Sequence, residues 1–196
     1  MGKLAPIVLF VYNRMEHTRQ TVEALLQNDL AIESDLYVYS DGPKDDEERK
    51  VESVREYIRT IKGFKNVYIV EREKNWGLAN SIIAGVTETI ETCGKVIVLE
   101  DDFVCANCFL MYMNRALDKY SAEKKVFSIT GYSFLQDEEA EDVPDTYFAS
   151  ITSSRTWATW KDRWQYFDEG AKGYRRLAWD YKLRRKFNYD NTYAYY

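Results

Sequence analysis

The sequence predicts an α/β fold in which helices flank a mostly parallel sheet, and three observations lead to this expectation. Short runs of β-branched and aliphatic residues, typical of strands buried on both faces, alternate with longer stretches of helical periodicity. The alternation repeats four times before residue 103, which is the pattern of right-handed βαβ units. Each buried run ends in polar residues, so these side chains are expected to meet at one edge of the sheet.

The first half of the chain supplies most of this pattern. Strands are expected where apolar residues run without interruption, at 6–12, 36–39, 67–70 and 95–99. Helices are expected where apolar residues recur every three or four positions, at 16–28, 44–61 and 78–92. Ser40-Asp41-Gly42-Pro43 is a turn signal that ends the second strand.

The second half is less regular. The sequence predicts a helix over 107–120, a strand over 126–130, an exposed acidic loop over 136–145 and a basic helix over 172–187. The residues after 187 carry no stop signal, so we expect the fold to be truncated at its C-terminal end.

Three tryptophans, Trp157, Trp160 and Trp164, recur at helical spacing. This spacing predicts the inner stripe of a short helix. The alternative is a wall of indole faces on which a sugar stacks.

Composition limits the class of protein. Apolar residues make up 45% of the chain and charged residues 30%, which is ordinary for one globular domain. No apolar run resembles a signal peptide or a membrane span, and three cysteines are an odd count, so reduced thiols in a cytoplasm are expected. The single histidine, His17, argues against hydrolases built on a histidine base.

The net charge of −5 is unevenly distributed. Residues 172–196 contain seven Lys or Arg and two Asp, a net charge of +5, so residues 1–171 carry −10. The acidic part argues against general nucleic-acid binding. The basic part suits an anionic membrane surface or an acceptor that carries phosphate.

The acidic run Glu100-Asp101-Asp102 follows the fourth strand directly. Adjacent carboxylates repel one another, so such a cluster is most stable where a cation lies on it. Mg²⁺ takes one or two protein carboxylates and completes its shell with phosphate and water oxygens. We therefore expect a divalent cation and a diphosphate at this strand end, with an acidic surface turn as the alternative.

No glycine-rich phosphate loop follows the first strand. Arg14 stands there instead, and its guanidinium could grip phosphate oxygens in bidentate fashion. The alternative is a surface ion pair with Glu16.

The motifs along the chain occur in a characteristic order. They are Tyr12-Asn13-Arg14, Ser40-Asp41-Gly42, Asn75-x-Gly77-Leu78-x-Asn80, Glu100-Asp101-Asp102 and Trp157-Ala158-Thr159-Trp160. This order resembles that of the GT-A glycosyltransferases and is similar to the bacterial family 2-like sugar transferases. The acidic motif is similar to that of N-acetylglucosaminyltransferase I, and the resemblance covers nearly the whole chain.

The resemblance implies a single GT-A-like catalytic domain over 1–196. A nucleotide-binding half would span 1–103, and an incomplete acceptor-side half would span 104–196. The implied reaction moves a hexosyl or N-acetylhexosaminyl group from a nucleotide-sugar, a UDP-sugar, to a glycan or lipid-linked acceptor, with inversion and with Mn²⁺ or Mg²⁺. The cysteine count and the basic segment, apart from the resemblance, predict a cytoplasmic protein with a peripheral membrane contact through residues 172–187.

The resemblance also implies roles for single residues. Asp102 would bind the metal, Glu100 and Asp101 would contact the ribose or the sugar, and Arg14 would hold phosphate. Asp41 would read the uracil edge. The remaining nucleotide-sugar contacts would come from Tyr12, Asn13, Asn75, Gly77 and Asn80, and the acceptor side from Trp157 and Trp160.

The catalytic base is the least defined part of the site. An inverting transferase needs a carboxylate within hydrogen-bond reach of the acceptor hydroxyl. Related enzymes supply it from a Trp-Asp type motif, which Trp179-Asp180 matches; Asp168 is a weaker candidate, and the base could also lie beyond residue 196.

Three other functions remain open from the sequence. A chain that holds the donor but lacks the base would be a nucleotide-sugar-binding module without turnover. A nucleotidyltransferase uses the same sheet and metal but usually places a glycine-rich basic loop after the first strand, which is absent here. A phospho-receiver domain would need an acidic pair after the first strand, where Asn13-Arg14 stand.

Overall fold

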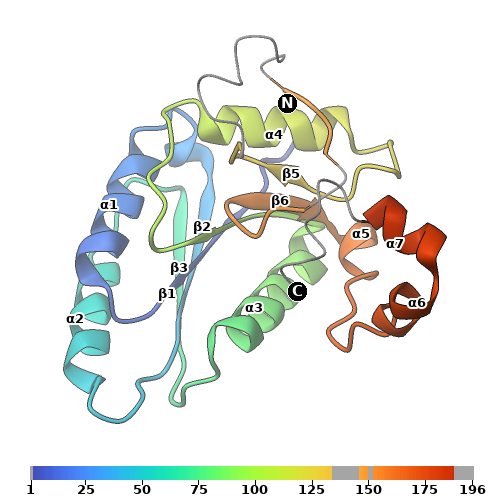
Figure 1. Ribbon diagram of the computed structural model, residues 1–196. Coiled ribbons are helices and arrows are strands. Elements are labelled where there is room, and N and C mark those ends of the chain that lie inside the picture. The colour runs from blue at the N-terminus through green and yellow to red at the C-terminus, as the bar shows by residue number, and fades with distance from the viewer. Residues whose placement is uncertain (1, 134–145, 150–151, 188–196) are drawn as a thin grey trace, which may run out of the picture. The chain divides into compact units, whose positions relative to one another are not determined.

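The computed structural model describes residues 2–133, 146–149 and 152–187 (Figure 1). The chain divides into two compact units: residues 1–133 with 153–164, and residues 134–152 with 165–196. The loop expected over 136–145 lies outside the described residues. No helix in the described ranges is both long and apolar enough to cross a membrane.

The first unit is built on one sheet of six strands. They are β1 (Ile7–Val11), β2 (Asp35–Ser40), β3 (Asn66–Glu71), β4 (Lys95–Glu100), β5 (Ile129–Thr130) and β6 (Trp157–Trp160), in the order β3-β2-β1-β4-β6-β5. The first four strands run parallel, and β6 pairs antiparallel with both β4 and β5. The predicted mostly parallel α/β fold is therefore confirmed, although the strand expected over 126–130 is confined to Ile129 and Thr130.

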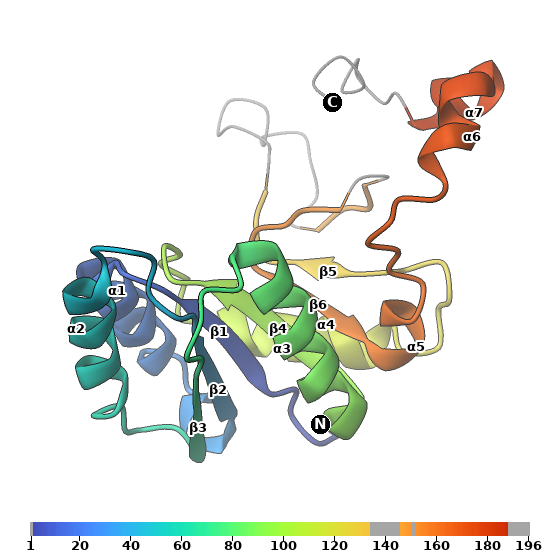
Figure 2. The same ribbon diagram turned by 90° about the horizontal axis from the view of Figure 1, so that it is seen from below.

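Helices cover both faces of this sheet. The helices α1 (Met15–Leu26), α2 (Glu48–Ile58) and α4 (Phe109–Lys119) pack on one face, where Leu25, Ile58 and Leu110 are fully buried. The helix α3 (Leu78–Cys93) packs on the other face through Val86 and Ile90. Figure 2 shows α3 on one side of the strands and α4 on the other. A 3₁₀ turn, η1 (Ala31–Glu33), lies between α1 and β2.

The tryptophan-rich segment is a strand, and the helix expected from its spacing is wrong. Trp157 to Trp160 form β6, with Ala158 paired to Ile97 of β4, and only Lys161–Trp164 turn into the short helix α5. Side chains alternate across a strand. Ala158 and Trp160 accordingly lie in the core on the α4 face, while Trp157 packs on the α3 face and stacks on Trp164 with ring centroids 5.7 Å apart.

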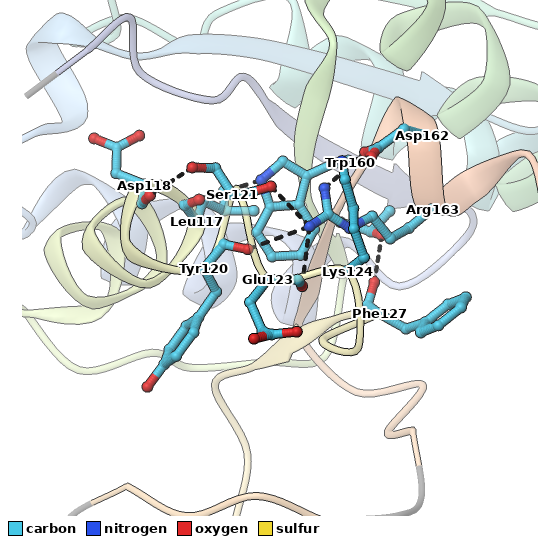
Figure 3. A network of polar contacts seen from close by, with 11 residues as sticks. Leu117, Asp118, Tyr120, Ser121, Glu123, Lys124, Phe127, Trp160, Asp162 and Arg163 are labelled. Carbon is cyan, nitrogen blue, oxygen red and sulfur yellow. Dashed lines mark hydrogen bonds and ion pairs between the residues drawn. The ribbon is translucent and has the colours of Figure 1, made fainter.

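Trp160 and Arg163 fasten this strand to the end of α4 (Figure 3). The Trp160 Nε1–H donates to the carbonyl of Leu117 at 3.2 Å, and the Arg163 guanidinium lies 4.3 Å from the Trp160 ring centroid. Arg163 Nη2 donates to three carbonyls just beyond α4, those of Tyr120, Ser121 and Glu123, at 2.8–3.2 Å. The Trp160 contact satisfies a carbonyl in the last turn of α4, where a helix end leaves carbonyls without a partner, and Arg163 adds a second donor to the carbonyls of Tyr120 and Glu123.

The described part of the second unit contains two short helices, α6 (Tyr174–Trp179) and α7 (Tyr181–Phe187). The single helix expected over 172–187 is therefore wrong. It is interrupted at Asp180, whose backbone is extended and whose carboxylate accepts a hydrogen bond from the Leu183 amide at 3.0 Å. Aspartate is a favoured helix N-cap, so Asp180 starts a new helix and does not continue the old one.

Candidate functional site

The carboxyl ends of the four parallel strands meet at one edge of the sheet in the first unit. Arg14 follows β1, Asp41 follows β2, Arg72 follows β3, and Asp101 and Asp102 follow β4. Ligands of open α/β sheets bind at this edge. The structure therefore brings residues from four distant parts of the sequence to the place where the sequence predicted a site.

Arg14 lies across the acidic end of β4. Its guanidinium forms an ion pair with Asp101 and a second with Asp102, the latter with Nη1 and Oδ2 3.0 Å apart. The alternative partner, Glu16, instead pairs with Arg19 on the surface of α1. The positive charge expected on the acidic cluster is thus supplied in the structure by a side chain of this chain.

Burial distinguishes the three carboxylates. The Asp101 side chain is 4% exposed and that of Asp102 is 36% exposed, while Glu100 is half-buried. Burial raises the pKa of Asp101 even though Arg14 opposes the shift. Burial, followed by the charges of Asp102 and Asp101, also raises the pKa of Glu100. A further cation near these groups would favour their ionised forms.

The donor set of this corner fits a hard divalent cation. Asp101 Oδ2 is buried and has no hydrogen-bond partner, and the neighbouring Asp102 carboxylate reaches solvent. Among the described residues there is no group of three or more His, Cys, Asp or Glu side chains that could hold a metal. One or two carboxylates completed by phosphate and water oxygens is a usual Mg²⁺ environment. Asp102 is therefore the residue that could hold Mn²⁺ or Mg²⁺ together with a diphosphate, and Asp101 offers one unpaired oxygen to the same ligand.

Tyr12 and Asn13 are held by a residue that the sequence analysis missed. The Tyr12 hydroxyl donates to Glu47 Oε2 at 2.5 Å, and Asn13 Nδ2 donates to Glu47 Oε1 at 2.7 Å. Burial and the hydrogen bond to Glu47 raise the pKa of the Tyr12 hydroxyl. Glu47 lies at the start of α2 in a run of charged residues, so no local signal distinguishes it from a solvated surface.

Asp41 organises the loop before α3. Its two carboxylate oxygens accept hydrogen bonds from the backbone amides of Gly42, Trp76 and Gly77, each with a contact of 2.9 Å. Asn75, in the same loop as Trp76 and Gly77, donates from Nδ2 to the Gly42 carbonyl at 2.8 Å. The Trp76 amide also lies 3.2 Å from Oδ2, so the three backbone donors engage both carboxylate oxygens.

Gly42 is essential to this close approach, and we predict that Gly42→Ala damages the loop. A Cβ atom at this position would lie 2.3 Å from the Lys74 carbonyl carbon and 2.8 Å from the Asn75 nitrogen. Backbone atoms must then move, which should lower the free energy of unfolding by about 2 kcal/mol in urea titrations. At Gly173 a Cβ meets no atom within 4 Å and φ is −68°, so Gly173→Ala is the matched control and should cause no loss. Equal stability of both variants would contradict the prediction.

Two further arginines were not predicted as site residues. Arg55 of α2 donates to the carbonyls of Asp41 and Arg72 at 3.3 and 2.7 Å and so joins the ends of β2 and β3. The Arg72 side chain is 8% exposed and lies 3.7 Å from the Trp76 ring centroid. Its Nη2 pairs with Glu88 at 3.6 Å, and neither Nε nor Nη2 has a hydrogen-bond partner. Its position directly after a parallel strand, like that of Arg14, is the signal that could have identified it.

The other predicted residues are placed as follows. Asn80 Nδ2 donates to the Trp76 carbonyl at 2.8 Å, and with Asn75, Trp76, Ile83 and Ala84 it lines an open pocket of about 540 Å³. Trp160 is 6% exposed and belongs to the core, so its assignment to the acceptor side is corrected. Its indole fills space beside α4 and presents no face to a sugar. Trp157 is half-buried.

The carboxylates considered for the base both belong to the second unit. Asp180 caps α7 through the Leu183 amide. Asp168 accepts hydrogen bonds from the amides of Gly170 and Lys172 at 3.2 and 2.7 Å. Both side chains therefore have local structural roles.

Comparison with known proteins identifies the family. A solved structure similar to this chain is the mannosyltransferase PcManGT from Pyrobaculum calidifontis in complex with GDP-Man and Mn²⁺, at 16% sequence identity and a TM-score of 0.48. The alignment covers 66% of this chain and 36% of that one, so the chain spans about a third of that protein's length. No curated protein matches. The sequence model described as Glycosyl transferase family 2 matches residues 7–181, well over half of the chain, and this chain therefore belongs to glycosyl transferase family 2.

Proposed function

We propose that this chain is a metal-dependent glycosyltransferase domain that binds a UDP-sugar and transfers the sugar to a glycan or lipid-linked acceptor. The observation that carries the proposal is the corner where Arg14 meets Asp101 and Asp102 at the carboxyl edge of the sheet. Membership of glycosyl transferase family 2 supports sugar transfer as the reaction class.

The charges at this corner suit a nucleoside diphosphate and a cation. Asp102, the more exposed carboxylate, would hold Mn²⁺ or Mg²⁺, and Asp101 and Glu100 would contact the ribose or the sugar. A bound divalent cation would stabilise the negative charge on the departing nucleoside diphosphate. Arg14 is near enough to grip phosphate oxygens, because its guanidinium already spans both carboxylates.

The loop held by Asp41 would bind the nucleobase of the donor. The Asp41 carboxylate, which fixes the Trp76 and Gly77 amides, would read the uracil edge. Tyr12 and Asn13, fixed by Glu47, would form the opposite wall. Arg72 is buried and pairs with Glu88 through Nη2, and its Nε–H, which has no hydrogen-bond partner, could donate to a carbonyl or phosphate oxygen of the same ligand. Asn75, Gly77 and Asn80 would complete the pocket.

Inversion at the sugar requires a base for the acceptor hydroxyl. Asp180 remains the proposed residue, and its second carboxylate oxygen could accept a proton while the first caps α7. A chain without a working base would bind the donor and not turn it over, so donor binding and transfer must be measured separately.

Donor binding is tested by isothermal titration calorimetry of UDP in MnCl₂ and in EDTA. We expect binding in Mn²⁺ that is at least about tenfold weaker in EDTA, because the cation and the diphosphate bind together. GDP, which differs from UDP in its nucleobase, is the control for uracil recognition and should bind more weakly than UDP. The absence of UDP binding in Mn²⁺, or equal binding in EDTA, would contradict the proposal.

A further inference from the structure

The second unit contains a concentrated positive charge that the proposed reaction does not use. Residues 172–187 hold seven Lys or Arg and one acidic residue, Asp180, a net charge of +6. The whole chain carries −5, so all other residues together carry −11. Asp180 caps α7 and is only one negative charge among seven positive ones. The positive charge is therefore concentrated in this segment of the chain.

Two aromatic side chains stand in the middle of this charge. Trp179 is 89% exposed and Tyr181 is 69% exposed, and they flank the break between α6 and α7. Around them, four basic side chains are exposed, and within the described ranges none of them takes part in an ion pair: Arg175, Arg176, Lys182 and Arg185. We call these six residues the basic-aromatic patch. Leu177 and Leu183 are partly buried, and the two helices contact each other.

We infer that the basic-aromatic patch binds the surface of a membrane that contains anionic lipids. Charge complementarity selects an anionic surface, since each Lys or Arg near such a surface is attracted by its negative potential. The exposed indole and phenol select lipid, because Trp and Tyr are amphipathic and settle at the level of the headgroups. Most of the surface of these two rings is exposed to water, and insertion at the interface would bury it.

The geometry of the patch fits peripheral binding. Its six residues lie on α6 and α7, helices of six and seven residues that are too short to cross a bilayer. Attraction falls off within about 10 Å of the surface, so the acidic remainder of the chain is repelled only where it comes equally close. The patch would hold the enzyme at the surface where a lipid-linked acceptor lies; this consequence rests on the proposed function, whereas lipid binding itself does not.

The inference is tested by sedimentation of the full chain with vesicles. Vesicles of phosphatidylcholine with 30% phosphatidylglycerol should bind the chain, pure phosphatidylcholine should bind it far more weakly, and raised salt should release it. Reversing the four basic residues, Arg175→Glu, Arg176→Glu, Lys182→Glu and Arg185→Glu, should reduce the partition coefficient at least about 100-fold. Trp179→Ser with Tyr181→Ser should reduce it about tenfold or more at unchanged charge.

The control variant reverses four exposed basic residues of the first unit. Arg49→Glu, Lys50→Glu, Lys62→Glu and Lys65→Glu change the net charge by the same amount and should retain most of the binding. Circular dichroism verifies that each variant is folded. If Trp179 enters the lipid interface, tryptophan emission should shift to shorter wavelength when vesicles are added. This shift should be absent in Trp179→Phe.

Three results would overturn the inference. The first is equal binding to neutral and anionic vesicles, and the second is an equal loss in the control and patch variants. The third is tighter binding to a DNA oligonucleotide than to vesicles, which would identify a nucleic-acid surface. Calorimetry with UDP and Mn²⁺ distinguishes a failure of the membrane inference from a failure of the proposed function. The patch variants should bind UDP as the unmodified chain does.

Discussion

Asp102→Asn should lower the affinity for UDP in Mn²⁺ by at least about 100-fold, or about 2.7 kcal/mol. The substitution keeps the size of the side chain and removes the charge that a divalent cation requires. It also removes one of the two carboxylates that orient Arg14, whose Nη1 lies 3.0 Å from Asp102 Oδ2. Titration calorimetry of UDP in Mn²⁺ measures this loss directly, without knowledge of the acceptor.

A matched substitution separates the metal role from a general charge effect. Asp29 is exposed between α1 and η1, and Asp29→Asn removes the same charge from the chain. This variant should bind UDP in Mn²⁺ with unchanged affinity. In EDTA, Asp102→Asn and the unmodified chain should differ little, because the cation no longer contributes. Retention of UDP affinity within threefold in Asp102→Asn and Mn²⁺ would exclude Asp102 as the metal residue.

Arg163→Ala should have the largest effect on stability, a loss of about 3 kcal/mol in the free energy of unfolding. Arg163 is 5% exposed, and its removal takes one donor from each of three carbonyls and the guanidinium from the face of Trp160. The Ser121 carbonyl loses the donor it has, whereas the other two also accept a backbone amide. Asp162 would lose one of its two cationic partners. Urea unfolding of both proteins at one pH measures the difference.

The neighbouring Lys161 provides the control for Arg163. Lys161 is half exposed and pairs with Glu91 at the surface, so Lys161→Ala should cost less than about 1 kcal/mol. UDP binding by Arg163→Ala below its unfolding transition should be normal, because Arg163 contacts α4 and not the carboxyl edge of the sheet. A loss below 1 kcal/mol would show that the carbonyls find other donors.

Local patterns were sufficient to predict most of the fold. Val96 to Leu99 are all buried, and a continuous apolar run of this kind is what a central parallel strand requires. The same reasoning located the polar strand ends, and with them the corner of Arg14, Asp101 and Asp102. For these strands, the local sequence pattern and the tertiary structure both require apolar residues along the strand and polar residues at its end.

The sequence was misleading where tertiary contacts decided the structure. Trp157 and Trp160 are three residues apart, which suits a helix, but pairing with β4 makes them strand residues on opposite faces. Similarly, the apolar positions between 172 and 187 suit one helix, while the Asp180 side chain starts a second one. In both cases the spacing of the apolar residues suited a continuous helix, but one specific interaction determined a different structure.

The supporting residues of the site could not be read from the sequence. Asp41 contacts backbone amides 35 and 36 residues away, and Glu47 holds side chains 34 and 35 residues away. Backbone amides have no sequence signature, and Glu47 lies among many charged residues. Such contacts depend on how the loops after β1, β2 and β3 approach one another, which no local pattern encodes.

The position of β1 has a consequence for synthesis of the protein. β1 pairs on one side with β2 and on the other with β4, which ends at Glu100. A nascent chain that has released fewer than about 100 residues from the ribosome therefore leaves one edge of its most apolar strand open. Chaperones that bind extended hydrophobic segments would have their main target here, and they would lose it when β4 emerges and closes that edge.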